Sequence, residues 1–285
     1  MIKTILSDLF SFIRKPDDRQ ITLSVKDKLF YVIVLLVLEF VLSYLLIFPV
    51  LDGVDDLVDL RTAEEGPLTL VKSFVSFVIV APIGEELVFR YFLRYNGLKT
   101  MFINQKTWPK IFPYLVYLSG ILFGFVHISN YTNSGNLFFA LSPLIILTQF
   151  IGGFIISFIR VRLNFSYGVL YHALWNFMVA IAIPIVQDSF TEPFHQQTSA
   201  YTITIEEQLF YKKGEGHYIK IDSTATGAIH KIDVKQYFLQ HMLDTLYTKD
   251  KYYGGELLIN LKLQSKAGIN KQELLKIIKK EYDIE

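Results

Sequence analysis

Two adjacent glutamates and an arginine stand in one of the most apolar parts of the sequence. They are Glu85, Glu86 and Arg90, in the stretch APIGEELVFRYFLR of residues 81–94. A charge at the centre of a bilayer costs about 2.5–3.5 kcal/mol on insertion scales, so it usually faces a cavity and has a function. Helical residues four apart share a face, so Glu86 and Arg90 can form an ion pair. Glu85 points about 100° away from that pair and stays free of it.

Two more apolar stretches carry imidazole and amide side chains. Phe123 and His127 are four residues apart in FGFVH, and so are His172 and Asn176 in YHALWN. Each pair therefore shares a helix face. A further acid in an apolar run, Glu39, stands alone and is assigned no role.

A carboxylate, two imidazoles and an amide are the groups that the activation of a water molecule needs. A carboxylate in a poorly solvated cavity has a raised pKa, which makes it a competent general base. One imidazole can share the water or bind a metal, while a second imidazole and an amide can donate to a developing oxyanion. Glu85 and His127 match in depth if their helices form an antiparallel hairpin that turns near residues 100–108.

Composition excludes several other classes of function. Hydrophobic residues make up 52% and aromatic residues 15%, both above the soluble average. The net charge is +1, with no basic stripe and no glycine-rich phosphate loop, so we expect no nucleic-acid partner. The chain has no cysteine, which excludes a disulfide scaffold, thiolate metal sites and a cysteine nucleophile.

Five apolar stretches approach or exceed the length of about 20 residues that crosses a bilayer. They are 29–51, 68–92, 111–127, 137–159 and 168–186. The first is too long for a cleaved signal peptide and follows a charged stretch. We therefore expect an α-helical integral membrane bundle of about five transmembrane helices, surrounded by membrane lipid.

The loop charges predict an orientation, because short cytoplasmic loops collect Lys and Arg. Segment 1–28 is basic, loop 52–66 is acidic, and the next loop is basic again. This alternation places 1–28 in the cytoplasm and residues 191–285 outside it. The short membrane core and the extra domain favour a bacterial cytoplasmic (inner) membrane.

Residues 191–285 hold no long apolar run and read as a small soluble α+β domain. The sequence GEG, at 214–216, favours a hairpin between the first two of its strands. Asn270 is a predicted N-cap. The predicted elements are strands at 201–211, 217–223 and 255–264 and helices at 232–247 and 270–282.

The three polar motifs, in this order, resemble those of the CPBP family of intramembrane proteases. That family comprises type II CAAX prenyl endopeptidases and bacterial bacteriocin-processing and immunity (Abi) relatives. Its motifs, Glu-Glu-x-x-x-Arg, Phe-x-x-x-His and His-x-x-x-Asn, stand here as EELVFR, FGFVH and HALWN, with the common Ala-Pro at 81–82. The resemblance covers roughly 67–187, a four-helix protease core, and neither the first span, 29–51, nor the tail.

The resemblance implies hydrolysis of a peptide bond in a membrane-associated peptide or protein. Glu85 and His127 would activate the water. His172 and Asn176 would stabilise the oxyanion; the alternative for this pair is hydrogen bonding between helices. The residues implied to support the site are Glu86, Arg90 and Phe123.

Metal dependence and activity both stay open at this point. Two histidines and a glutamate could bind one divalent ion such as zinc, with Glu85, His127 and His172 as ligands. The same residues could act without metal, and the HExxH signature is absent. The alternative function is a catalytically silent immunity or scaffold protein of the same fold, with the C-terminal domain as binding module. A proton-coupled transporter is disfavoured by the lack of a visible repeat. Neither the substrate nor the oligomeric state can be read from the residues.

Overall fold

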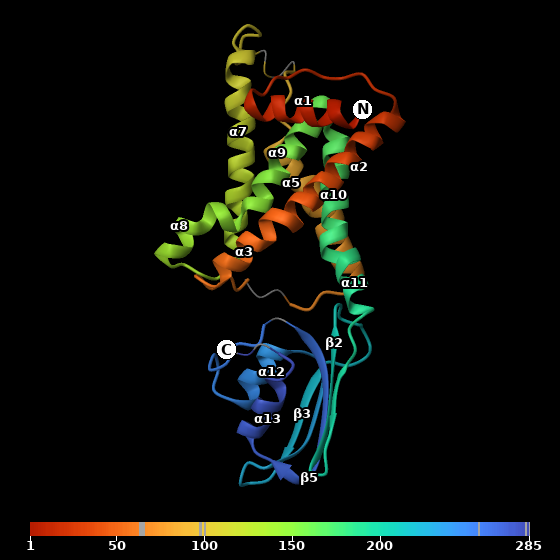
Figure 1. Ribbon diagram of the computed structural model, residues 1–285, viewed down its shortest axis with the longest axis vertical. Helices are drawn as coiled ribbons and strands as arrows, with labels where there is room; N and C mark the ends of the chain where they lie inside the picture. The colour runs from red at the N-terminus through yellow and green to blue at the C-terminus, as the bar shows by residue number, and fades with distance from the viewer. Residues whose placement is uncertain (63–65, 97–98, 100, 256, 283, 285) are drawn as a thin grey trace. The chain divides into compact units, whose positions relative to one another are not determined.

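The computed structural model describes residues 1–62, 66–96, 99, 101–255, 257–282 and 284. The chain divides into two compact units. A helical unit comprises Met1–Ala63 and Val75–Met178, and a sheet unit comprises Glu64–Phe74 and Val179–Glu285. Figure 1 shows the helices of the first unit and the antiparallel sheet of the second.

The helical part contains α-helices interrupted by short π-helical segments, in which hydrogen bonds run from residue i to i+5. The α-helices are α1 (Ile2–Arg14), α2 (Val25–Leu42), α3 (Phe48–Asp55), α4 (Leu70–Ser73), α5 (Ala81–Phe89), α7 (Trp108–Val126), α8 (Asn136–Ile145), α9 (Leu147–Arg162), α10 (Phe165–Phe177) and α11 (Ile183–Asp188). The π segments are η1 (Ser43–Ile47), η2 (Phe74–Val80) and η4 (Met178–Ala182), and a 3-10 turn, η3, covers His127–Asn130.

Within the described residues, four helical stretches are long and apolar enough to cross a membrane. They are Val25–Asp55, Trp108–Asn130, Asn136–Arg162 and Phe165–Asp188. These four match the predicted spans 29–51, 111–127, 137–159 and 168–186. The fifth predicted span, 68–92, is helical from α4 through α5 but is not confirmed as a span.

Helix α9 lies at the centre of the helical unit, where α7, α10, α1 and α2 all pack against it. Its residues from Gly152 to Arg162 are almost all buried. Gly152 and Gly153 let neighbours approach closely, since a Cβ atom at Gly153 would lie 3.1 Å from the ring of Phe123. Small residues serve this purpose in membrane helices because close packing replaces the hydrophobic effect there.

The end of α9 binds the N-terminal segment through a buried arginine. Arg162 donates from Nε to Asp8 at 2.9 Å and from Nη1 to Asp17 at 3.0 Å. Charge-assisted hydrogen bonds of this kind are about twice as strong as neutral ones. Segment 1–28, predicted to be cytoplasmic, therefore includes a helix that is packed on the bundle.

The sheet unit is built on five antiparallel strands in the order β1-β2-β5-β4-β3. Helices α12 (Leu239–Leu246) and α13 (Lys271–Ile278) cover one of its faces (Figure 1). Asn270 caps α13 by accepting from the N–H of Glu273 at 2.9 Å, which confirms the predicted cap. The strands are β1 (Phe194–Gln197), β2 (Tyr201–Gln208), β3 (Tyr218–Ser223), β4 (Ile229–Phe238) and β5 (Leu258–Ile269).

Two predictions for this unit were wrong. Residues 232–247 were predicted as one helix, but β4 runs to Phe238 and only Leu239–Leu246 is helical. The inward Ile232 and Val234 are two residues apart, which is the period of a strand, and β4 pairs with β3 and β5 on both sides. The hairpin at 214–216 is absent because β2 and β3 are not neighbours in the sheet.

Candidate functional site

A buried ion pair stands at the end of α5. Arg90 donates from Nη1 to Glu86 Oε1 at 2.9 Å, and both side chains are fully buried. The Arg90 guanidinium also lies 3.7 Å from the centre of the Phe123 ring, a cation–π contact that offsets part of its lost hydration. The pair that the four-residue spacing predicted is present.

His172, from α10, binds the same carboxylate. Its Nδ1 lies 3.0 Å from Glu86 Oε1, and the side chain is 6% exposed. A carboxylate only accepts, so Nδ1 carries the proton. The opposite nitrogen, Nε2, faces Glu85 Oε2 at 3.7 Å. Glu86 thus fixes both the tautomer and the orientation of an imidazole that is turned towards Glu85.

Glu85 is free of the ion pair, as the spacing predicted. Its side chain is 30% exposed, yet Oε2 is a buried atom with no hydrogen-bond partner among the described residues. A separation of 3.7 Å from His172 Nε2 is too long for a direct hydrogen bond. Two polar atoms at this separation can share one water molecule. The geometry therefore suits a carboxylate and an imidazole that act on the same water.

Phe123 brings the remaining motif, FGFVH, next to Arg90 and His172. His127 follows α7 in η3, is half-buried, and donates from Nδ1 to the carbonyl of Phe123 at 2.7 Å. The Phe123 ring lies 4.8 Å from the His127 ring and 5.7 Å from the His172 ring. All three motifs therefore meet around one aromatic side chain, with both histidine rings in edge contact with it.

Asn176 is used in a bond between helices. Its Nδ2 donates to the carbonyl of Phe77, in η2, at 2.8 Å. In the i-to-i+5 pattern the partner of that carbonyl would be the N–H of residue 82, but Pro82 has none. Asn176 thus satisfies a carbonyl that the π segment and the proline leave without a backbone donor. The second hydrogen of Nδ2 is still available to another acceptor.

This bond predicts a stability effect for Asn176. Replacing Asn176 by Leu leaves the Phe77 carbonyl unpaired, which should lower the free energy of unfolding by about 1–3 kcal/mol. Adding Pro82→Ala restores a backbone N–H and should recover part of the loss. Thermal unfolding of both variants in detergent measures this. If the Asn176→Leu protein were as stable as the wild type but inactive, the bond to the Phe77 carbonyl would not be structural. Asn176 would then act only in stabilising the oxyanion.

Sequence reasoning missed two residues that hold the end of α5. Ser119 donates to the carbonyl of Phe89 at 2.6 Å, and Arg160 donates to the carbonyl of Arg90 at 3.2 Å. Carbonyls at a helix C-terminus have no intrahelical partner, so these side chains satisfy them. The charge of Arg160 within a mostly apolar stretch was the available signal.

A second buried polar contact joins α2 to α10. Glu39 is 1% exposed and accepts a hydrogen bond from the Tyr171 hydroxyl. Gly152 of α9 faces this contact, because a Cβ atom there would lie 2.6 Å from Glu39 Oε1. Tyr171 precedes His172, so the contact helps to fix the helix that carries the imidazole.

Gly152→Ala is expected to destabilise the helical unit. The new methyl group would overlap the buried carboxylate of Glu39, and overpacking of this kind costs about 1–3 kcal/mol. Gly53→Ala, in α3, is the matched control because its Cβ would meet nothing within 4 Å. Its expected effect is a gain of about 0.5–1 kcal/mol. Equal melting temperatures for the two variants would contradict the close approach at Gly152.

The metal prediction can be compared with the donor geometry. Across the part of the chain that the structure describes, no group of three His, Asp or Glu side chains is placed to hold a metal ion. His172 Nδ1 is bonded to Glu86 and His127 Nδ1 to a backbone carbonyl, which leaves Nε2 of each ring available to a ligand. The predicted set Glu85, His127 and His172 is not gathered as a ligand group in this arrangement of the described residues, and metal binding stays a prediction.

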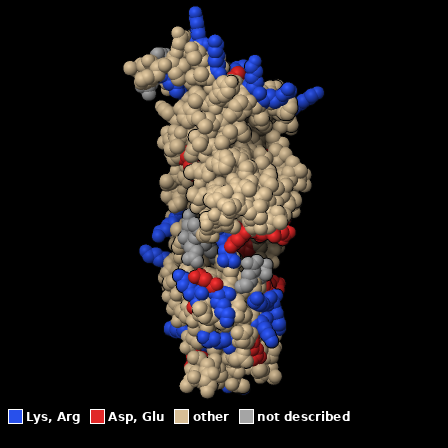
Figure 2. Space-filling view, turned by 90° about the vertical axis from the view of Figure 1, so that its left-hand side faces the viewer, with Lys and Arg blue, Asp and Glu red and all other residues tan. Residues whose placement is uncertain are grey.

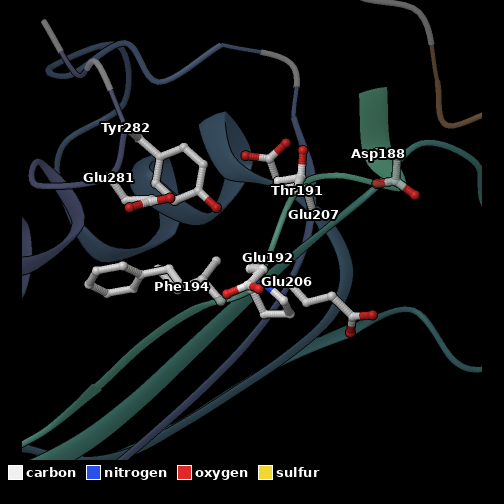
Figure 3. A pocket seen from close by; sticks show the side chains of 10 residues that line it. Asp188, Thr191, Glu192, Phe194, Glu206, Glu207, Glu281 and Tyr282 are labelled. Atoms are coloured by element: carbon white, nitrogen blue, oxygen red, sulfur yellow. The ribbon is translucent and has the colours of Figure 1, made fainter. Parts of the chain in front are cut away.

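The sheet unit has a pocket of its own. Figure 3 shows that acidic side chains line this pocket together with Tyr282. Burial raises the pKa of Glu207 in this pocket. Its labelled acids are Asp188, Glu192, Glu206, Glu207 and Glu281.

The comparison with protein families agrees with this geometry. The family model described as type II CAAX prenyl endopeptidase Rce1-like matches residues 67–178. That range contains every residue of the three motifs, from Glu85 to Asn176. No curated protein and no solved structure matches the chain. The resemblance to the CPBP family is thus confirmed for residues 67–178, which are similar to type II CAAX prenyl endopeptidases, and the chain is an integral membrane protein.

Proposed function

We propose that this protein is an intramembrane endopeptidase that hydrolyses a peptide bond of a membrane-held peptide or protein. The observation that carries the proposal is the pair formed by Glu85 Oε2 and His172 Nε2, 3.7 Å apart. A carboxylate with an unpartnered oxygen and an oriented imidazole are what water activation requires. The family match over the same residues supports the same reaction class.

In the proposed mechanism Glu85 is the general base. It takes a proton from the water whose oxygen attacks the scissile carbonyl carbon, and this proton later passes to the leaving amine. Glu86 orients His172 through Nδ1, as the acid of a catalytic triad orients its histidine. His127, whose Nδ1 is held by the Phe123 carbonyl, is a further partner of the water beside Glu85 and His172.

The oxyanion that forms on attack needs hydrogen-bond donors. In its doubly protonated form His172 donates from Nε2–H to the oxyanion, while its Nδ1–H stays bonded to Glu86. Asn176 supplies its second N–H. Each donor is anchored by a bond in the structure, to Glu86 or to the Phe77 carbonyl, so little reorganisation accompanies the reaction.

This mechanism is of the glutamate type and needs no metal ligand. The competing proposal, a zinc ion on Glu85, His127 and His172, would use Nε2 of each histidine while Nδ1 keeps the bond that it makes here, and it requires the three side chains to come together. Metal analysis of the purified, active protein distinguishes the two. A stoichiometric divalent ion lost together with activity would overturn the glutamate-type mechanism.

The substrate is proposed to be a bacteriocin leader, a signal-peptide remnant or a membrane protein of a bacterial inner membrane. The experiment compares membrane and secreted peptides from cells that express the wild type or Glu85→Gln. Uncut precursors that accumulate only with Glu85→Gln support the proposal and name the substrate. An identical peptide profile, with the cellular phenotype kept, would favour the silent scaffold.

A further inference from the structure

The apolar surface of α1 is wider than the part that the protein covers. Ile5, Leu9 and Phe12 are buried in the helical unit, and the ring of Phe12 packs on Phe158 of α9. A second set of apolar side chains on the same helix points outward. The outward residues and their exposed fractions are Ile2 (52%), Leu6 (37%), Phe10 (62%) and Ile13 (39%).

The outward apolar face is bordered by cations. Successive residues turn by about 100°, which places Leu6 and Phe10 side by side, with Lys3 and Arg14 just beyond Phe10. The Arg14 guanidinium lies 5.7 Å from the centre of the Phe10 ring. An apolar stripe edged by Lys and Arg is the pattern of a helix that lies in the plane of a membrane surface.

Two acids of this region are bound to a buried arginine, although the side chain of Asp17 is still 53% exposed. Asp8 and Asp17 bind the buried Arg162, whereas Lys3 and Arg14 are exposed. The C-terminal end of α1 is held as well, because the Tyr117 hydroxyl donates to the carbonyls of Ile13 at 2.9 Å and Arg14 at 3.0 Å. The helix therefore presents a fixed face.

The position of α1 agrees with a membrane surface. It lies crosswise to α7, near one end of the helical unit (Figure 1). Figure 2 shows Lys and Arg gathered at this end, next to a zone of the helical unit almost without charged side chains. The helical unit contains the helices that are long and apolar enough to cross a membrane, and α1 lies near one end of them.

We propose that α1 is an interfacial helix bound to anionic lipid. Ile2, Leu6, Phe10 and Ile13 enter the boundary between acyl chains and headgroups, and the flanking Lys3 and Arg14 bind lipid phosphates. Basic residues near an anionic surface attract it through its negative potential. The inference is independent of the proposed peptidase activity.

Spin labels test the proposal sharply, because the full chain has no cysteine and each introduced thiol is unique. Nitroxide labels are placed singly at Leu6→Cys and Phe10→Cys, with Ser7→Cys and Ser11→Cys as exposed controls further around the helix, beyond Lys3 and Arg14. The protein is reconstituted in phosphatidylcholine vesicles with and without phosphatidylglycerol. Power saturation then measures access to oxygen, which enters lipid, and to a water-soluble nickel complex.

Labels at Leu6 and Phe10 should favour oxygen several-fold over nickel, and labels at Ser7 and Ser11 should favour nickel. Lys3→Gln with Arg14→Gln should make the Phe10 label shallower only in vesicles with phosphatidylglycerol; Lys249→Gln, an exposed lysine of the sheet unit, should not. Nickel access that is equal at all four positions would overturn the proposal. Dipolar broadening of the spectrum of the Phe10 label would also overturn the proposal if it disappears on dilution with unlabelled protein. That result would mean that the outward face of α1 binds a second copy of the chain.

Discussion

Replacing Glu85 by Gln is expected to lower kcat for peptide cleavage by about 10²–10⁴-fold. Gln is nearly isosteric with Glu but cannot accept the proton of the attacking water. Because Glu85 is outside the Glu86–Arg90 pair, the variant should insert and fold like the wild type. The measurement is single-turnover cleavage of a precursor peptide in proteoliposomes.

The matched control for this experiment is Glu192→Gln, an exposed acid of the sheet unit. It should leave kcat unchanged. A Glu85→Gln protein with more than a tenth of wild-type kcat would remove Glu85 as the general base. The reaction would then depend on another group, with His127 the next residue to vary.

Removing Arg90 is expected to be the most destabilising single change in the helical unit. Arg90→Met leaves the fully buried carboxylate of Glu86 without its cation. Breaking a buried ion pair from one side costs about 3–5 kcal/mol, since an uncompensated charge stays behind. Thermal unfolding in detergent should therefore show a large fall in melting temperature, and cleavage should be lost with it.

The double variant Glu86→Gln, Arg90→Met separates stability from catalysis. Replacing both partners of a buried pair is often neutral, so most of the stability should return. Activity should stay low because His172 loses the carboxylate that orients it. As a control, Arg19→Met removes an exposed pair with Asp8 and should change stability by about 0–1 kcal/mol. A melting temperature for Arg90→Met equal to that of Arg19→Met would show that the buried Glu86–Arg90 pair does not stabilise the helical unit.

The local part of the site could be predicted from the sequence. Spacing alone paired Glu86 with Arg90 and left Glu85 apart, because four residues make about one helical turn. The larger arrangement was harder. Matching depths along ideal α-helices pointed to His127 as the partner of Glu85, whereas the structure brings His172 to 3.7 Å. The depth of each residue along its helix was counted with the α-helical rise per residue. That rise does not apply within the π segment η2 or the 3-10 turn η3.

Other features depend on contacts that no local pattern encodes. The strand at Ile229–Phe238 looked helical until its pairing on both sides was known. The role of Gly152 depends on Glu39, more than 100 residues away in the chain. Segment 1–28 could be recognised as basic, but the division of α1 into a buried and an outward apolar face needs the position of α9.

The π segment η2 has a consequence for how this helix tolerates change. Bonding from i to i+5 accommodates one residue more per turn than α-helical bonding. Deleting one residue within Phe74–Val80 would remove that extra residue and let the α pattern close, so Glu85 should keep its direction relative to the residues that precede the segment. In a segment that is α-helical throughout, the same deletion would turn Glu85 by about 100°. The π segment therefore makes this helix tolerant of a one-residue change in length, and a variant that lacks one of these residues should keep Glu85 in place.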